Sequence, residues 1–204
     1  FPRIGELPYF LTLGPYAFYW FELVEQPAPI SARVVPQPAE SPAEFPALLV
    51  GSAWDTLLEG NVRHLIERDC LPAYLGRQRW FAGRSRTIRS ARIVDWAVTR
   101  RGREPAFLTI AEVTFAGDQR ERYLLPLATE SGTQADRVLN ETPETVLARL
   151  TGARKGVLYD ACGGEKIGRE LLALMSGGGT LPTRHGVITG QRTSALDEVA
   201  RECD

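Results

Sequence analysis

Arginine and aromatic side chains gather in one stretch of this 204-residue chain. Residues 77–103 hold nine arginines and one acid, Asp95. Arginine beside aromatic rings can stack on bases and grip phosphates, so the stretch is a candidate surface for nucleic acid or an acidic protein partner. Much of it is predicted to lie on strands, where outward positions are normally charged, so solvated faces and inter-domain ion pairs are favoured. The candidates for a structural or interface role are Arg79, Trp80, Phe81, Gly83 and Arg84.

A bulky pair, Trp80-Phe81, precedes the small pair Ala82-Gly83. This order is typical of side chains that plug a core where a helix meets a strand, and a sugar-stacking platform is the alternative. If Trp80 is such a plug, its replacement by Ala should destabilise the fold by roughly 3–5 kcal/mol.

Other patterns that carry chemistry are absent from the sequence. His64 and His185 lie far apart, and no G-x-S-x-G or H-E-x-x-H motif occurs. Residues 163–166 could open a helix and bind an anion, but Glu165 places a negative charge there. No H-R-D-type or D-F-G-type sequence could hold magnesium and a nucleophile. We therefore predict no catalytic, cofactor-binding or metal-binding residue.

Composition and charge restrict the class of protein. The hydrophobic fraction is 44% and the net charge is −1, so a core is expected and global charge does not indicate a polyanionic partner. Three distant cysteines (Cys70, Cys162 and Cys203) favour a reducing cytoplasm over a disulfide framework. No apolar run approaches the roughly 18–20 residues that span a bilayer. The chain begins without Met, which suggests a fragment, a processed chain or a deliberately shortened one.

Four regions follow along the chain. Residues 1–24 read as strand, turn and strand, and residues 25–46 form a Pro-rich linker. The third region is residues 47–130, and the fourth is residues 131–204. The predicted fold class is α+β, a curved antiparallel sheet with packed helices, preceded by the hairpin and the linker.

The predicted elements come from apolar periodicity. A helix capped by Ser52 should carry a stripe through Ile66, and a second helix should run from Leu71 to Gly76. Strands are expected at 87–100, 106–115, 120–127, 146–150, 156–159 and 185–189, and one more helix is expected at 167–175. The first of these strands should alternate around Val94, Trp96 and Val98. Gly117-Asp118 should form the turn after the second strand, which should carry Phe107, Ala111, Val113 and Phe115 on one face.

Three blocks resemble the amino-terminal cap subdomain of bacterial maltokinases. They are residues 78–84 (QRWFAGR), residues 121–127 (ERYLLPL) and residues 158–161 (LYDA). The resemblance implies that residues 47–130 form the cap, and that residues 131–204 hold the rest of the cap and a truncated start of the kinase amino-terminal lobe. The resemblance implies a parent kinase that uses ATP and magnesium to phosphorylate maltose at its anomeric hydroxyl, giving maltose 1-phosphate for α-glucan synthesis.

Residues 1–21 resemble the carboxyl end of trehalose synthase, a glycoside hydrolase family 13 isomerase that interconverts maltose and trehalose. The two halves together resemble a trehalose synthase–maltokinase fusion. That resemblance implies an inactive junction with no cofactor of its own. Its partners would be the kinase catalytic lobe and the trehalose synthase domain of one parent chain, and a homo-oligomer stays open.

Overall fold

The computed structural model describes residues 45–196. The predicted hairpin at 1–24, most of the predicted linker at 25–46 and Cys203 lie outside the described residues. The chain divides into two units, Phe1–Glu40 and Ser41–Asp204, and everything described below belongs to the second.

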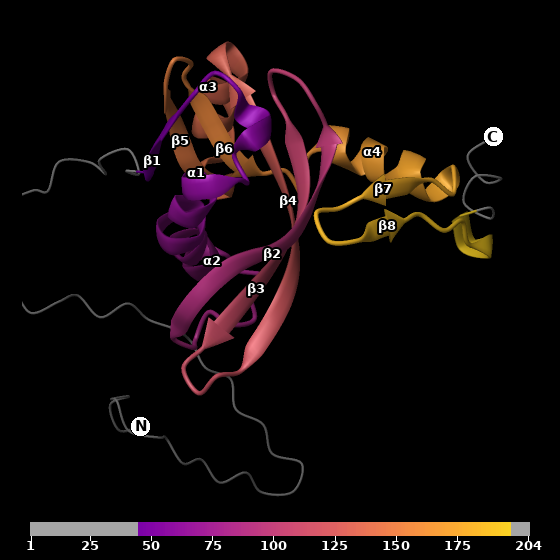
Figure 1. Ribbon diagram of the computed structural model, residues 1–204, viewed down its shortest axis with the longest axis horizontal. Helices are drawn as coiled ribbons and strands as arrows, with labels where there is room; N and C mark the ends of the chain where they lie inside the picture. Colours follow the sequence, from indigo (N-terminus) through magenta and orange to yellow (C-terminus); the bar gives the residue numbers. More distant parts are fainter. Residues whose placement is uncertain (1–44, 197–204) are drawn as a thin grey trace, which may run out of the picture. The chain divides into compact units, whose positions relative to one another are not determined.

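A curled six-stranded sheet forms the centre of this unit (Figure 1), with the strand order β1-β5-β6-β4-β3-β2. The α+β prediction is confirmed. The sheet is mixed rather than purely antiparallel, because β1 pairs with β5 in parallel. The strands are β1 (Ala47–Val50), β2 (Ile88–Arg100), β3 (Ala106–Phe115), β4 (Arg120–Ser131), β5 (Val146–Gly152) and β6 (Gly156–Asp160).

Alternating apolar residues hold β3 against the core. Phe107, Ala111, Val113 and Phe115 lie on one face as predicted, and all four belong to the main hydrophobic cluster. The turn to β4 uses Gly117 and Asp118, whose φ angles are 93° and 60°. The Asp118 N–H donates to the Phe115 carbonyl at 3.1 Å, and Gly117 adopts its positive φ without steric cost, which allows this tight turn.

A bulge changes the pattern of β2. Its pairing with β3 shifts between Ile93 and Asp95, so Val94 is the extra residue. The core side chains are therefore Ile93 before the bulge and Trp96 after it. Alternation through Val94, as expected from the sequence, is wrong at this point, because the inserted residue reverses the faces.

One face of the sheet is covered by the first helical segment. It contains the 3₁₀ turn η1 (Trp54–Thr56), helix α1 (Gly60–Leu65), the π-helical turn η2 (Ile66–Cys70) and helix α2 (Leu71–Arg77). Ser52 does not cap this helix, because α1 begins only after Glu59. Pro72 occupies the first turn of α2, where its missing N–H costs nothing.

The remaining elements follow β4. They are α3 (Gly132–Glu141), the 3₁₀ turn η3 (Pro143–Thr145), α4 (Glu165–Ser176) and a separate hairpin of β7 (Thr180–Pro182) and β8 (Val187–Thr189). Helix α3 and strand β7 were not predicted. The division expected after residue 130 falls inside β4, and β5 and β6 belong to the same sheet as β2–β4.

Candidate functional site

The α2–β2 loop carries the five candidate residues. Phe81 is only 2% exposed and lies in the main core cluster. Its ring stacks on Phe115, with centroids 6.1 Å apart, and meets Tyr123 at 5.1 Å. Helix α2 ends at Arg77, and the Phe81 N–H then donates to the Gln78 carbonyl, which turns the chain towards the sheet. Phe81 is therefore the core anchor of the loop.

Gly83 is required by close packing. A Cβ atom at this position would lie 2.4 Å from the Phe115 ring and 2.7 Å from the Phe81 ring. Contacts below 3.0 Å cannot be relieved without moving one of two buried rings. The absence of a side chain at Gly83 thus lets the loop pass directly over the aromatic cluster.

Trp80 does not fill the core. Its side chain is 48% exposed, and its ring contacts Phe81 edge-on at 6.3 Å and Tyr123 at 6.1 Å. The interpretation of the Trp80-Phe81 pair as a joint core plug therefore fails for Trp80, because neighbouring residues of the loop face opposite directions. Arg79 and Arg84 are also exposed, so the structure separates the five candidates into two buried and three surface residues.

The next arginine of the loop is engaged with the sheet. The Arg86 guanidinium carbon lies 3.7 Å from the centroid of the Phe115 ring, and Nη2 donates to Glu121 at 2.6 Å. Hydrogen bonds from Tyr123 and then from Arg86 lower the pKa of Glu121. Partial burial, together with the hydrogen bond to Glu121, raises the pKa of Tyr123 to about 12. Arg86 serves as packing as well as charge.

A buried hydrogen bond joins helix α2 to the end of strand β6. The Tyr74 hydroxyl on α2 donates to Asp160 Oδ2 at 2.5 Å, and the Cys162 N–H donates to Asp160 Oδ1 at 2.8 Å. Burial, and then the bond to Asp160, raises the pKa of Tyr74 well above its usual range. Asp160 lies in the LYDA block noted in the sequence, but its buried partner Tyr74 could not be found from spacing.

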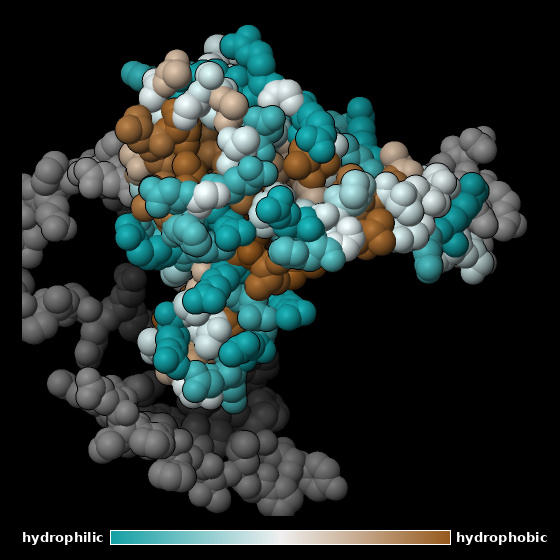
Figure 2. Space-filling model, viewed as in Figure 1, coloured by the Kyte–Doolittle hydropathy of each residue, from teal (hydrophilic) through white to brown (hydrophobic). Residues whose placement is uncertain are grey.

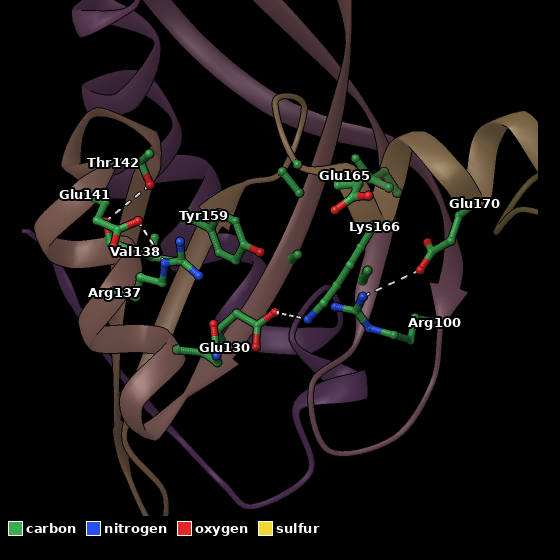
Figure 3. A pocket seen from close by; sticks show the side chains of 16 residues that line it. Arg100, Glu130, Arg137, Val138, Glu141, Thr142, Tyr159, Glu165, Lys166 and Glu170 are labelled. Atoms are coloured by element: carbon green, nitrogen blue, oxygen red, sulfur yellow. Dashed lines mark hydrogen bonds and ion pairs between the residues drawn. The ribbon is translucent and has the colours of Figure 1, made fainter.

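Sequence reasoning also missed a pocket between α3 and α4 (Figure 3). Its volume is about 400 Å³, and Ala106, Ala128 and Ala161 contribute small side chains to its lining. Lys166 Nζ lies 3.0 Å from Glu130 Oε1, and Arg100 Nη1 lies 3.5 Å from Glu170 Oε1. Because α3 was not predicted, no signal in the sequence placed these side chains around one cavity.

Tyr159 also lines this pocket (Figure 3). Burial, reinforced by the nearby Glu130 carboxylate, raises the pKa of the Tyr159 hydroxyl. The phenol therefore stays protonated and neutral at ordinary pH, so its role in the pocket is that of a hydrogen-bonding group and an apolar wall. The Lys166–Glu130 and Arg100–Glu170 pairs make the rest of the pocket a set of matched charges.

Hydrophilic side chains cover most of the face shown in Figure 2. Apolar residues gather over β1 and β5, where Leu49 is 77% exposed, and in a smaller patch on the β7–β8 hairpin, where Val187 is 60% exposed. Over residues 45–196, no helix is both long and apolar enough to cross a bilayer.

Metal chemistry has no obvious position in the described part of the chain. Within residues 45–196, no group of three or more His, Cys, Asp or Glu side chains could hold a metal ion. Cys70 is buried and Cys162 is exposed, and both are free thiols. Burial raises the pKa of the Cys70 thiol to about 11, which makes it a poor nucleophile.

Comparison with known proteins identifies the central region. Residues 74–163 match the family model described as the maltokinase N-terminal cap domain. No curated protein matches the chain. The matched region begins at Tyr74 and reaches just beyond Asp160, so the buried hydrogen bond closes the domain near its two limits. Residues 74–163, which make up less than half of the chain, are therefore similar to the maltokinase N-terminal cap domain.

Proposed function

We propose that this chain supplies the non-catalytic cap of a maltokinase-type phosphotransferase. The parent enzyme would move the γ-phosphoryl group of ATP to the anomeric hydroxyl of maltose, with magnesium as cofactor. The observation that carries this proposal is the cap-domain match over residues 74–163 on an α+β fold. The named side chains of the α2–β2 loop support a packing and interface role, since Phe81 and Gly83 bind the loop to the sheet.

The proposal that the cap is non-catalytic is supported by the engagement of one carboxylate among the described residues. Phosphoryl transfer needs cations around the phosphates, magnesium ligands and a group that orients the nucleophile. Asp160 supplies the carboxylate of the LYDA block, which resembles the maltokinase cap. Its two oxygens accept hydrogen bonds from the Tyr74 hydroxyl and from the backbone N–H of Cys162. It is therefore engaged as a structural acceptor.

We further propose that the parent is a trehalose synthase–maltokinase fusion working in the cytoplasm. This rests on the resemblance of residues 1–21 to the end of trehalose synthase and on the Pro-rich stretch at 25–46. The partners of the cap would be the kinase catalytic lobe and the trehalose synthase domain of the same chain. The two free cysteines among the described residues favour a reducing compartment.

The complete reading frame tests both parts of this proposal. We expect a (β/α)8 barrel encoded before Phe1 and a kinase lobe encoded after Asp204. The complete product should form maltose 1-phosphate from maltose and Mg-ATP, and should interconvert maltose and trehalose. If the reading frame encodes a kinase lobe but no barrel, the fusion proposal is wrong and the kinase proposal stands. A complete product that does not phosphorylate maltose would remove the kinase assignment.

A second function is favoured by one observation. Trp80 is half-exposed between Arg79 and Arg84, neither of which has a side-chain partner within residues 45–196. These residues could form a binding module for nucleic acid or an acidic protein. Salt-sensitive RNA binding that is lost in Trp80→Ala would support this alternative, whereas the cap proposal predicts no RNA binding at physiological ionic strength.

A further inference from the structure

Cations converge on the turn between β2 and β3. This turn and the first half of α4 line a hollow of about 560 Å³. We call it the cationic hollow, and its positively charged lining residues are Arg100, Arg101, Arg103, Lys166 and Arg169. Its two carboxylates are Glu104 and Glu170. Three of the five cations pair with carboxylates, so the positive charge that a bound anion would neutralise comes from Arg101 and Arg103.

Two of these arginines are free to bind. The Arg100 guanidinium lies 3.5 Å from Glu170. Lys166 and Arg169 pair with the carboxylates of Glu130 and Glu165. Arg101 and Arg103 are exposed, and within residues 45–196 neither guanidinium has a hydrogen bond or ion pair.

The turn that carries them is held in place. Gly102, between the two free arginines, has a φ of 113°, which side-chain-bearing residues rarely adopt. Arg100 Nε donates to the Glu104 carbonyl at 2.9 Å across the turn. Arg154, whose guanidinium stacks on the buried Trp54, donates to the Arg103 carbonyl. The backbone positions of Arg101 and Arg103 are thus fixed before any ligand binds, which lowers the entropy cost of binding.

We propose that the cationic hollow binds a small anion that carries more than one phosphate charge. Guanidinium groups present paired N–H donors that match phosphate oxygens, and two free guanidinium groups on a fixed turn can hold two such groups. This site is independent of the proposed maltokinase function, because it uses none of the residues of the α2–β2 loop and its α4 side lies beyond the matched residues 74–163.

A small ligand fits better than a nucleic acid strand. The other arginines of the stretch precede β2 or lie in its first half, and β2 is a 13-residue strand about 40 Å long. There, Arg86 pairs with Glu121 and Arg89 with Asp118. These pairs interrupt the positive charge along the sheet, so the hollow is an isolated site and not one end of a track for a phosphate backbone.

Titration calorimetry of the whole chain with inorganic pyrophosphate tests the proposal. The double variant Arg101→Gln/Arg103→Gln should bind pyrophosphate at least about tenfold more weakly. The loss of one hydrogen bond to a charged group lowers binding affinity by about that factor. The matched control is Arg79→Gln/Arg84→Gln, which removes two exposed, unpaired arginines from the other end of β2. Its affinity should stay within about twofold of the original, because screening weakens distant charges.

Two further arms sharpen the result. The variant Arg101→Lys/Arg103→Lys keeps the charge and loses the paired donors, so it should bind with an affinity between those of the original and the Gln variant. Fructose 1,6-bisphosphate is also titrated in place of pyrophosphate. Tighter binding of fructose 1,6-bisphosphate would identify an organic phosphate as the ligand class, and tighter binding of pyrophosphate would identify a bare diphosphate. Thermal unfolding confirms that each variant is folded. No pyrophosphate binding by the original chain at millimolar concentration, or equal weakening in the two Gln variants, would overturn the proposal.

Discussion

The two ends of strand β2 are both rich in arginine, and they differ in how those side chains are used. At the α2–β2 end, Arg86 lies on the Phe115 ring and pairs with Glu121. At the β2–β3 end, Arg101 and Arg103 are exposed and unpaired within the described residues. The loop at the first end is anchored by Phe81, whereas the turn at the second is fixed by hydrogen bonds from the Arg100 and Arg154 side chains to its backbone carbonyls.

This difference shows that arginine density alone does not identify a binding surface. A guanidinium that covers an aromatic ring and meets a carboxylate contributes to packing, and its charge is already neutralised. A guanidinium with no partner on a fixed turn is available to a ligand. Mutations at the α2–β2 end should therefore change the stability of the fold, whereas mutations at the β2–β3 end should change ligand binding.

The largest effect is expected inside the Trp80-Phe81 pair. Phe81→Ala should lower the free energy of unfolding by about 3–5 kcal/mol, because it empties a core site beside Phe115. Trp80→Ala removes only a half-exposed ring and should cost about 1 kcal/mol. Urea unfolding followed by circular dichroism measures both. Equal losses of unfolding free energy in the two variants would contradict the assignment of Phe81 as the core anchor and Trp80 as a surface residue.

A smaller loss is expected at Gly83. A methyl group there would press on the Phe115 and Phe81 rings, so Gly83→Ala should destabilise the fold by about 1–3 kcal/mol. Gly76 in α2 is the control, since a Cβ atom there has no neighbour within 4 Å and Gly76→Ala should be neutral or stabilising by up to about 1 kcal/mol. The midpoints of urea unfolding decide this. A stabilised Gly83→Ala variant would contradict the close approach.

The paired and unpaired arginines of the loop should also differ. Arg86→Ala loses the contact with the Phe115 ring and the pair with Glu121, and should cost about 1 kcal/mol in unfolding free energy. Arg84→Ala changes an exposed side chain and should stay within about 0.5 kcal/mol of the original. If Arg84→Ala is the more damaging of the two, arginine packing does not stabilise this end.

The smallest effect concerns the bulge in β2. Asp95 accepts hydrogen bonds from the Thr183 hydroxyl at 2.7 Å and from the His185 N–H at 3.1 Å, which tie the β7–β8 hairpin to the sheet. Burial raises the pKa of Asp95, but the bonds from Thr183, His185 and Trp96 outweigh it and lower the pKa below its ordinary value. A lowered folded-state pKa gives stability that is present above the unfolded value and is lost as the pH falls.

Amide hydrogen exchange of the β7–β8 hairpin should therefore accelerate as the pH drops below about 4, after correction for the intrinsic exchange rate. Asp95→Asn should remove most of this pH dependence. Asp118→Asn, at the β3–β4 turn, should leave it unchanged. Protection that persists at low pH would show that Thr183 and His185 hold the hairpin without the carboxylate.

Regular parts of the fold could be predicted from the sequence. The limits of β3 are those expected from its apolar alternation, and Gly117-Asp118 forms the expected turn. Helix α4 begins after Gly164 and carries Ile167 and Leu171 inward, as its periodicity indicated. These elements are long, and each has one clearly apolar face.

The rest depends on tertiary contacts that spacing does not carry. Helix α3 has a single buried residue, Ala135, so its apolar stripe is too weak to recognise. The parallel pairing of β1 with β5 joins segments about a hundred residues apart. Trp80 and Phe81 are adjacent aromatic residues with nothing in their types to separate them, and only the packing of Phe115 and Tyr123 decides which is buried.

The central claim is that this chain caps a kinase without performing the phosphoryl transfer. Purified residues 1–204 incubated with maltose, ATP and magnesium provide the most direct test, with product measured as maltose 1-phosphate. The account predicts no product above the enzyme-free background, while circular dichroism shows a folded chain. Sustained formation of maltose 1-phosphate in proportion to the amount of chain would contradict it.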